Sequence, residues 1–169
     1  MDAGDPWFGT RFAFRGGDPW RASRLSLSRT RHRSPPTVLV TDDDAAMLAC
    51  VVELVRGVGF AVETASRGRD ALQILVHGSI DLTISDVHLP DMTGFEVLET
   101  YTSGPWVAPP ERGVARRLQR TAVPAIFMSG DATPEMHDRC ASLGWPLFDK
   151  PFAVDDMRTA IEKVLGRSG

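Results

Sequence analysis

Short runs of apolar residues alternate along the chain with segments in which apolar residues recur every three or four positions. The first pattern is typical of buried strands, and the second is typical of amphipathic helices. The apolar runs predict five strands, at residues 38–40, 60–65, 81–85, 123–128 and 146–149. The helical periodicity predicts five helices that follow these strands in turn, at residues 45–57, 67–77, 93–101, 133–142 and 153–165.

This regular alternation predicts an α/β fold. Strands that are apolar on both sides belong to a sheet whose two faces are covered, so we expect a five-stranded parallel, doubly wound sheet in a three-layer sandwich. Asp44 directly precedes the first helix, where its carboxylate can accept hydrogen bonds from the free N–H groups of the first turn.

Two segments lack the pattern and bound the domain that we expect at residues 37–166. Residues 1–36 hold seven arginines against three acids, which predicts a disordered extension; a basic arm that contacts nucleic acid or anionic lipid is the alternative. Residues 102–121 contain three prolines and four arginines and are longer than a usual connection. We expect a surface insertion there, which either decorates the surface or contacts a kinase or another partner.

The composition is that of a soluble globular protein, with 43% hydrophobic and 24% charged residues in a chain of 169. A net charge of -3 argues for neither a polyanionic partner nor an acidic tail. Cys50 and Cys140 lie in predicted helices without metal-site spacing, so we expect reduced core thiols. The chain lacks a secretory signal and an apolar run of roughly 18 residues, which predicts a cytoplasmic protein without membrane contact.

Polar residues that can carry chemistry follow the predicted strands. They are Asp42, Asp43 and Asp44 after the first strand, Asp86 after the third, Ser129 after the fourth, and Asp149 and Lys150 after the fifth. The carboxyl ends of parallel strands share one edge, so these groups should meet in one crevice. Clustered carboxylates repel unless a cation lies among them, and oxygen ligands favour Mg²⁺. A lysine and a hydroxyl beside a metal-bound carboxylate suit phosphoryl transfer, with a carboxylate as the available nucleophile.

With these residues in place, the segment 37–166 resembles the receiver domains of two-component response regulators, the CheY-like group with a flavodoxin-like fold. The matching pieces are VLVTDDD at 38–44, GFAVETASRGRDAL at 59–72, DLTISDVHLPDMTGFEVL at 81–98, PAIFMSG at 124–130 and FDKPF at 148–152. Each piece is weak alone, but together they occur in the order and in the elements that the family requires.

The resemblance implies a role for each matching residue. Asp86 would accept a phosphoryl group from a phosphohistidine on a sensor histidine kinase or phosphotransfer protein. The implied Mg²⁺ ligands are Asp42, Asp43, Asp86 and the backbone carbonyl of His88. Ser129 and Lys150 would bind phosphoryl oxygens, and the peptide bond between Lys150 and Pro151 is expected to be cis.

Together with Pro151, two further positions are expected to bear on switching. Asp131 lies where relatives vary the group that governs loss of the phosphoryl group, so we expect it to influence the lifetime of the phosphorylated state. Leu147 stands where many receivers carry a tyrosine or phenylalanine that rotates inward, a movement that a leucine cannot reproduce. The imidazole of His88 needs no role, and we expect Asp91 and Asp149 to be solvated acids.

The function expected from this resemblance is that of a phosphoacceptor that switches partner interactions and catalyses only its own phosphorylation and dephosphorylation. Few residues follow the last helix, so we expect no DNA-binding domain in this chain, and the downstream partner stays open. One alternative is a receiver-like interaction module that is not phosphorylated. The other is a phosphohydrolase with Asp86 as nucleophile, although such enzymes usually have an acid at the position of His88.

Overall fold

The computed structural model describes residues 35–104 and 122–166. Strands and helices alternate throughout: β1 Thr37–Thr41, α2 Ala45–Gly57, β2 Ala61–Ala65, α3 Gly68–His77, β3 Leu82–Asp86, α4 Gly94–Ser103, β4 Ala125–Ser129, α5 Pro134–Leu143, β5 Leu147–Asp149 and α6 Val154–Val164. Each bound lies within two residues of the one predicted from the pattern.

The segments that lacked a pattern fall largely outside the described residues. The predicted extension at 1–36 is described only from residue 35 onward. Of the predicted insertion at 102–121, residues 102 and 103 belong to α4, and residues 105–121 lie outside the described ranges.

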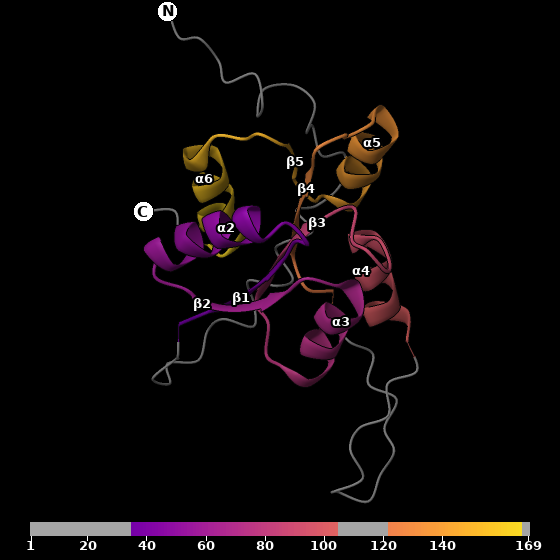
Figure 1. Ribbon diagram of the computed structural model, residues 1–169, viewed down its shortest axis with the longest axis horizontal. Coiled ribbons are helices and arrows are strands. Elements are labelled where there is room, and N and C mark those ends of the chain that lie inside the picture. The colour runs from indigo at the N-terminus through magenta and orange to yellow at the C-terminus, as the bar shows by residue number, and fades with distance from the viewer. Residues whose placement is uncertain (1–34, 105–121, 167–169) are drawn as a thin grey trace, which may run out of the picture.

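The five strands form one parallel sheet in the order β2-β1-β3-β4-β5. Helices α2 and α6 cover one face, and α3, α4 and α5 cover the other (Figure 1). This arrangement confirms the predicted doubly wound sandwich. The strand order reverses between β1 and β3, because the chain continues from β1 to β2 on one side and from β3 to β4 on the other. Folds of this class bind ligands in the crevice at the carboxyl ends of two such strands.

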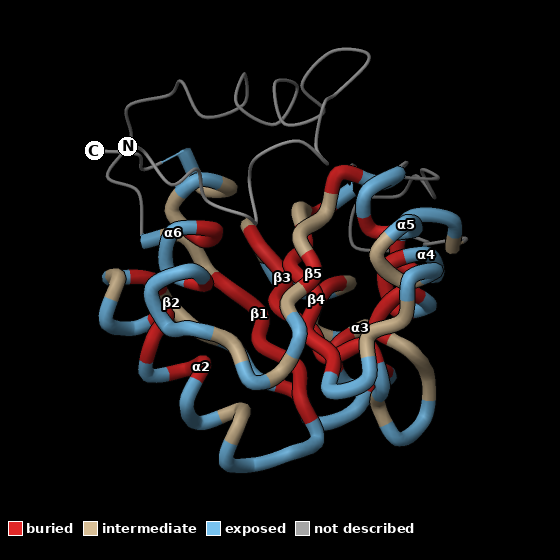
Figure 2. The backbone as a smooth tube through the Cα atoms, turned by 90° about the horizontal axis from the view of Figure 1, so that it is seen from above, coloured by how far each residue is buried: buried red, intermediate tan, exposed pale blue. Residues whose placement is uncertain are grey.

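Two apolar clusters fill the spaces between the layers, and strands β1, β3 and β4 run through the buried centre of the molecule (Figure 2). Every residue of β3 and β4 is buried, as expected for strands covered on both faces, and the buried residues of β3 include the polar Thr83, Ser85 and Asp86. One cluster joins Ile84 and Met128 to α2 and α6. The other joins Leu39 and Phe127 to α3, α4 and α5. The sheet is therefore held rigidly from both sides.

Helix ends follow their sequence signals. Asp44 caps α2 by accepting hydrogen bonds from the amides of the second and third residues after it, as predicted. Thr93 and Glu96 form a capping box at the start of α4. Gly144 ends α5 with a φ of 71°, a left-handed conformation that favours glycine.

The two cysteines are free, as predicted, but only one of them lies in the core. Cys140 is buried in α5, and Cys50 is exposed on α2, so the prediction of a core thiol at Cys50 was wrong. Cys50 precedes the buried Val51 by one residue, which turns its side chain about 100° around the helix. Within the described ranges, no helix has the length and apolarity that a bilayer crossing demands.

Candidate functional site

Three carboxylates gather at the carboxyl end of the sheet. Asp42 follows β1 and is fully buried, Asp43 is exposed beside it, and Asp86 ends β3 with 8% of its surface exposed. One oxygen of each carboxylate lies within 4.8 Å of the others. The parallel pairing of Thr41 with Ser85 brings the two strand ends side by side. The donor set consists of oxygen alone, which fits a hard divalent cation such as Mg²⁺.

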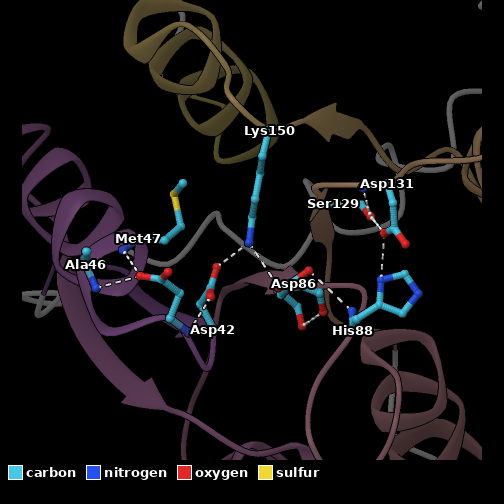
Figure 3. A network of polar contacts seen from close by, with 10 residues as sticks. Asp42, Ala46, Met47, Asp86, His88, Ser129, Asp131 and Lys150 are labelled. Atoms are coloured by element: carbon cyan, nitrogen blue, oxygen red, sulfur yellow. Dashed lines mark hydrogen bonds and ion pairs between the residues drawn. The ribbon is translucent and has the colours of Figure 1, made fainter.

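Lys150 reaches this cluster from the end of β5. Its Nζ lies 2.7 Å from Oδ2 of Asp42 and 2.9 Å from Oδ2 of Asp86, so the ammonium bridges the two carboxylates (Figure 3). The backbone amide of Lys150 donates to the carbonyl of Ser129 at 2.7 Å, which anchors the segment to β4. The peptide bond between Lys150 and Pro151 is cis, as the resemblance implied.

The charges of this cluster are mutually dependent. Burial raises the pKa of Asp42, and hydrogen bonds from Lys150 and the amide of Asp44 oppose that rise only in part. Burial also lowers the pKa of Lys150, but its hydrogen bonds to Asp42 and Asp86 more than offset this, so the pKa is raised. Lys150 therefore stays an ammonium. One ammonium faces three carboxylates, and this excess of negative charge favours binding of a further cation.

Ser129, Asp131 and His88 form a second polar group on the other side of Asp86 (Figure 3). The Ser129 hydroxyl is fully buried and donates to Oδ1 of Asp131 at 3.0 Å. The same oxygen lies 3.1 Å from Nδ1 of His88. The side chain of His88 is about half exposed, and its imidazole, for which no role was expected, contacts Asp131. A single carboxylate thus connects the loops that follow β3 and β4.

The loop after β3 is folded tightly against Asp86. The amide of His88 donates to Oδ1 of Asp86 at 3.3 Å, and the amide of Gly94 donates to the carbonyl of Val87 at 2.9 Å. A Cβ at position 94 would lie 2.5 Å from the carbonyl oxygen of Asp86 and 2.6 Å from Oγ of Ser85. Gly94 is required here because only a residue without a side chain allows so close an approach.

Three predicted positions lie apart from the acid cluster. Leu147 is buried in the apolar layer beneath α3, α4 and α5. Asp149 is exposed, and its Oδ1 lies 3.3 Å from Nε2 of His137, so it is not simply a solvated acid. Asp91 was also expected to be solvated, but it accepts hydrogen bonds from the backbone amides of Gly68 and Arg69. Sequence reasoning missed this contact, because no short-range spacing links residues more than 20 positions apart.

Comparison with known proteins gives several relatives. Residues 38–105 match the family model of the response regulator receiver domain. The cell cycle response regulator CtrA of Brucella ovis is 28% identical over 134 residues, which cover 78% of this chain and 50% of that protein. Probable histidine kinase 4 of Oryza sativa subsp. japonica is 28% identical over 138 residues, 76% of this chain and 14% of that protein. The chain thus spans half or less of these curated relatives.

Solved structures resemble this fold over almost their whole length. A CheY-like response regulator receiver domain protein from Methanospirillum hungatei has a TM-score of 0.62 at 25% identity, covering 79% of this chain and 95% of that one. The chemotaxis response regulator CheY4 of Vibrio cholerae has a TM-score of 0.62 at 26% identity, covering 78% of this chain and 100% of that one.

Proposed function

We propose that this chain, whose residues 38–105 match the receiver domain of response regulators, is the phosphoacceptor of a two-component phosphorelay. In this proposal, a sensor histidine kinase or phosphotransfer protein donates a phosphoryl group to Asp86, and the phosphorylated domain changes its interactions with a downstream partner.

One observation carries the proposal: three carboxylates and an ammonium from separate segments meet at one edge of the sheet. Burying Asp42 next to another carboxylate is unfavourable, and a domain with no use for the charge could replace both acids with apolar residues. The arrangement supports a site built to receive a cation and an anionic group. Its position at the carboxyl end of β1 and β3 is also where ligands bind in folds of this class.

Asp42, Asp43 and Asp86 would hold Mg²⁺ through carboxylate oxygens, and the backbone carbonyl of His88 is the fourth proposed protein ligand. When bound, Mg²⁺ would neutralise part of the charge on the phosphoryl oxygens. This explains why the site combines so many acids with an anionic substrate: the cation and Lys150 together offset the repulsion between the carboxylates and the incoming phosphate group.

The proposed reaction is an in-line displacement on phosphorus. A carboxylate oxygen of Asp86 forms the new P–O bond while the P–N bond to the donor histidine breaks, and the departing imidazole nitrogen keeps the electron pair. Lys150 lies close enough to Asp86 to pair with a phosphoryl oxygen without moving far. The Ser129 hydroxyl is bonded to Asp131, so it must turn from Asp131 to donate to the phosphoryl group.

Switching follows from this reorientation. The aspartyl phosphate adds negative charge beside Ser129, and the loop after β4 is drawn toward it, which shifts an equilibrium between two arrangements of the loop. Asp131 would influence the lifetime of the phosphorylated state, because it competes for the Ser129 hydroxyl in the unphosphorylated state and carries a charge that repels the phosphoryl group.

The test is labelling of the protein by a small acyl phosphate donor in the presence of Mg²⁺, followed by mass spectrometry of the intact chain. We expect one phosphoryl group on the wild type, none on Asp86→Asn, and normal labelling of the control Asp70→Asn, whose carboxylate is exposed on α3. Undiminished labelling of Asp86→Asn would contradict the assignment. A wild type that neither binds Mg²⁺ nor takes up phosphate would favour a constitutive interaction module instead.

A further inference from the structure

The loop between β3 and α4 contacts the first turn of α3 through Asp91. The amide of Gly68 donates to Oδ1 of Asp91 at 2.7 Å, and the amide of Arg69 donates to Oδ2 at 3.1 Å. Arg67, at the N-cap position of α3, makes no capping hydrogen bond with its side chain. Asp91 therefore supplies, from a distant segment, the acceptors that free N–H groups at the start of a helix require.

Charge and packing both strengthen this contact. Desolvation opposes the ionisation of Asp91, but hydrogen bonds from the amides of Arg69 and Gly68 hold its pKa below the ordinary value. The resulting carboxylate faces the positive end of the helix dipole. The next residue, Met92, packs directly on Gly68, where a Cβ would lie 2.2 Å from the Met92 Cγ. The absence of a side chain at position 68 thus allows the loop to lie against α3.

The same loop leads to the proposed metal site. Its two ends are fixed by backbone hydrogen bonds, from the amide of Val87 to the carbonyl of Met128 and from the amide of Gly94 to the carbonyl of Val87, each at 2.9 Å. Between these ends stands His88, whose amide bonds to Asp86 and whose carbonyl is the proposed ligand. An antiparallel bridge pairs His88 with Thr93, and the imidazole of His88 contacts Asp131. The contact of Asp91 with α3 adds a restraint on the tip of the loop, between His88 and Thr93.

We propose that Asp91 is a positioning residue for the metal site: by binding the first turn of α3, it fixes the loop that presents the His88 carbonyl beside Asp86. The inference rests on the proposed function, because it concerns the same Mg²⁺ site. It has a reciprocal consequence. If Asp91 favours metal binding by restraining the loop, bound metal must strengthen the restraint, and so must protect the first turn of α3 to the same extent.

The first experiment is a calorimetric Mg²⁺ titration of the full chain in three variants and the wild type. Asp91→Ala removes both acceptors and should raise the Kd for Mg²⁺ about tenfold, the lower end of the range for residues that orient a metal ligand. Asp91→Asn keeps one acceptor oxygen and should give a Kd between those of the wild type and Asp91→Ala. Asp70→Ala is the control: Asp70 is exposed and belongs to the first turn of α3 itself. Its removal should change the Kd by less than about twofold, because salt screens exposed charges.

The second experiment separates positioning from a general loss of stability. Amide hydrogen exchange of Gly68 and Arg69 is measured with and without Mg²⁺. In the wild type, Mg²⁺ should slow the exchange of both amides; in Asp91→Ala, exchange should be fast in either condition. Equal Mg²⁺ affinities of the wild type and Asp91→Ala would overturn this inference alone. Absence of Mg²⁺ binding by the wild type would overturn the proposed function, which the labelling of Asp86 tests separately.

Discussion

Replacing Lys150 by methionine removes the ammonium from the centre of the acid cluster and keeps the aliphatic stem of the side chain. In the wild type, Nζ contacts the fully buried carboxylate of Asp42 and the carboxylate of Asp86, whose side chain alone is 11% exposed. Lys150 itself is only 15% exposed, so solvent screens these contacts weakly. The variant leaves two nearly buried carboxylates facing each other without a cation.

Loss of one partner from a buried ion pair lowers the free energy of unfolding by about 3–5 kcal/mol. We expect about 3 kcal/mol, because the burial that raises the pKa of Asp42 also lets this group take up a proton when Lys150 is absent. With a urea dependence of about 2 kcal/mol per molar, the midpoint of unfolding should fall by about 1.5 M.

The loss of unfolding free energy caused by Lys150→Met should depend on pH in a defined direction. Without Lys150, the pKa of Asp42 in the folded state rises further above its ordinary value of 3.8, so the folded state binds a proton more readily than the unfolded state. A group of this kind stabilises the fold at low pH and loses that contribution as pH rises through the folded pKa. The difference between variant and wild type should therefore be largest near neutral pH and should shrink as pH falls toward 4.

The assay is urea unfolding followed by circular dichroism, in chelator and then with added Mg²⁺. Lys163→Met is the matched control, because Lys163 is the only other lysine of the sequence and lies exposed in the last turn of α6. Mg²⁺ should stabilise Lys150→Met more than the wild type, since the ammonium no longer neutralises the carboxylates. Equal urea midpoints for Lys150→Met and the wild type at neutral pH without Mg²⁺ would refute this reasoning.

Three shorter predictions test other parts of the molecule. Gly94→Ala places a methyl group 2.5 Å from the carbonyl oxygen of Asp86 and should lower the free energy of unfolding by about 1–3 kcal/mol in urea titrations. Iodoacetamide should modify the exposed Cys50 in the native protein but Cys140 only after unfolding. Burial shields the Cys140 thiol and raises its pKa to about 12, and peptide mass mapping measures the modification of each cysteine. Asp131→Ala frees the hydroxyl at the end of β4 and removes a repelling charge, so the half-life of the aspartyl phosphate should lengthen several-fold, and a shorter half-life would contradict this role.

The order and bounds of the elements could be predicted because their signals are local. The buried strand Ala125–Ser129 reads as a run of four apolar residues before its final serine, and Asp44 precedes its helix with the spacing that a cap requires. Even the gathering of acids, hydroxyl and lysine could be anticipated, since the carboxyl ends of parallel strands must meet at one edge. These inferences depend on topology and require no knowledge of individual side-chain contacts.

Contacts made by loops could not be predicted in this way. Asp91 caps a helix whose first residues lie 22 and 23 positions earlier, and the imidazole of His88 meets Asp131 across two loops. Such pairs have no periodicity, and their members look like ordinary surface residues. Cys50 shows a different limit: a stripe of apolar residues fixes the buried face of α2 only to within about one residue, or 100° of rotation.

Leu147 bears on how a change at Ser129 could reach the rest of the domain. It is 8% exposed at the start of β5, where it pairs with Phe127 of β4 and packs in the apolar layer. An aliphatic side chain offers no ring that rotates when the Ser129 hydroxyl moves. The structure instead connects Ser129 through Asp131 to His88, on the loop that Asp91 ties to α3. On the proposed function, phosphorylation of Asp86 would therefore act first on the loops after β3 and β4, and through them on the first turns of α3, α4 and α5.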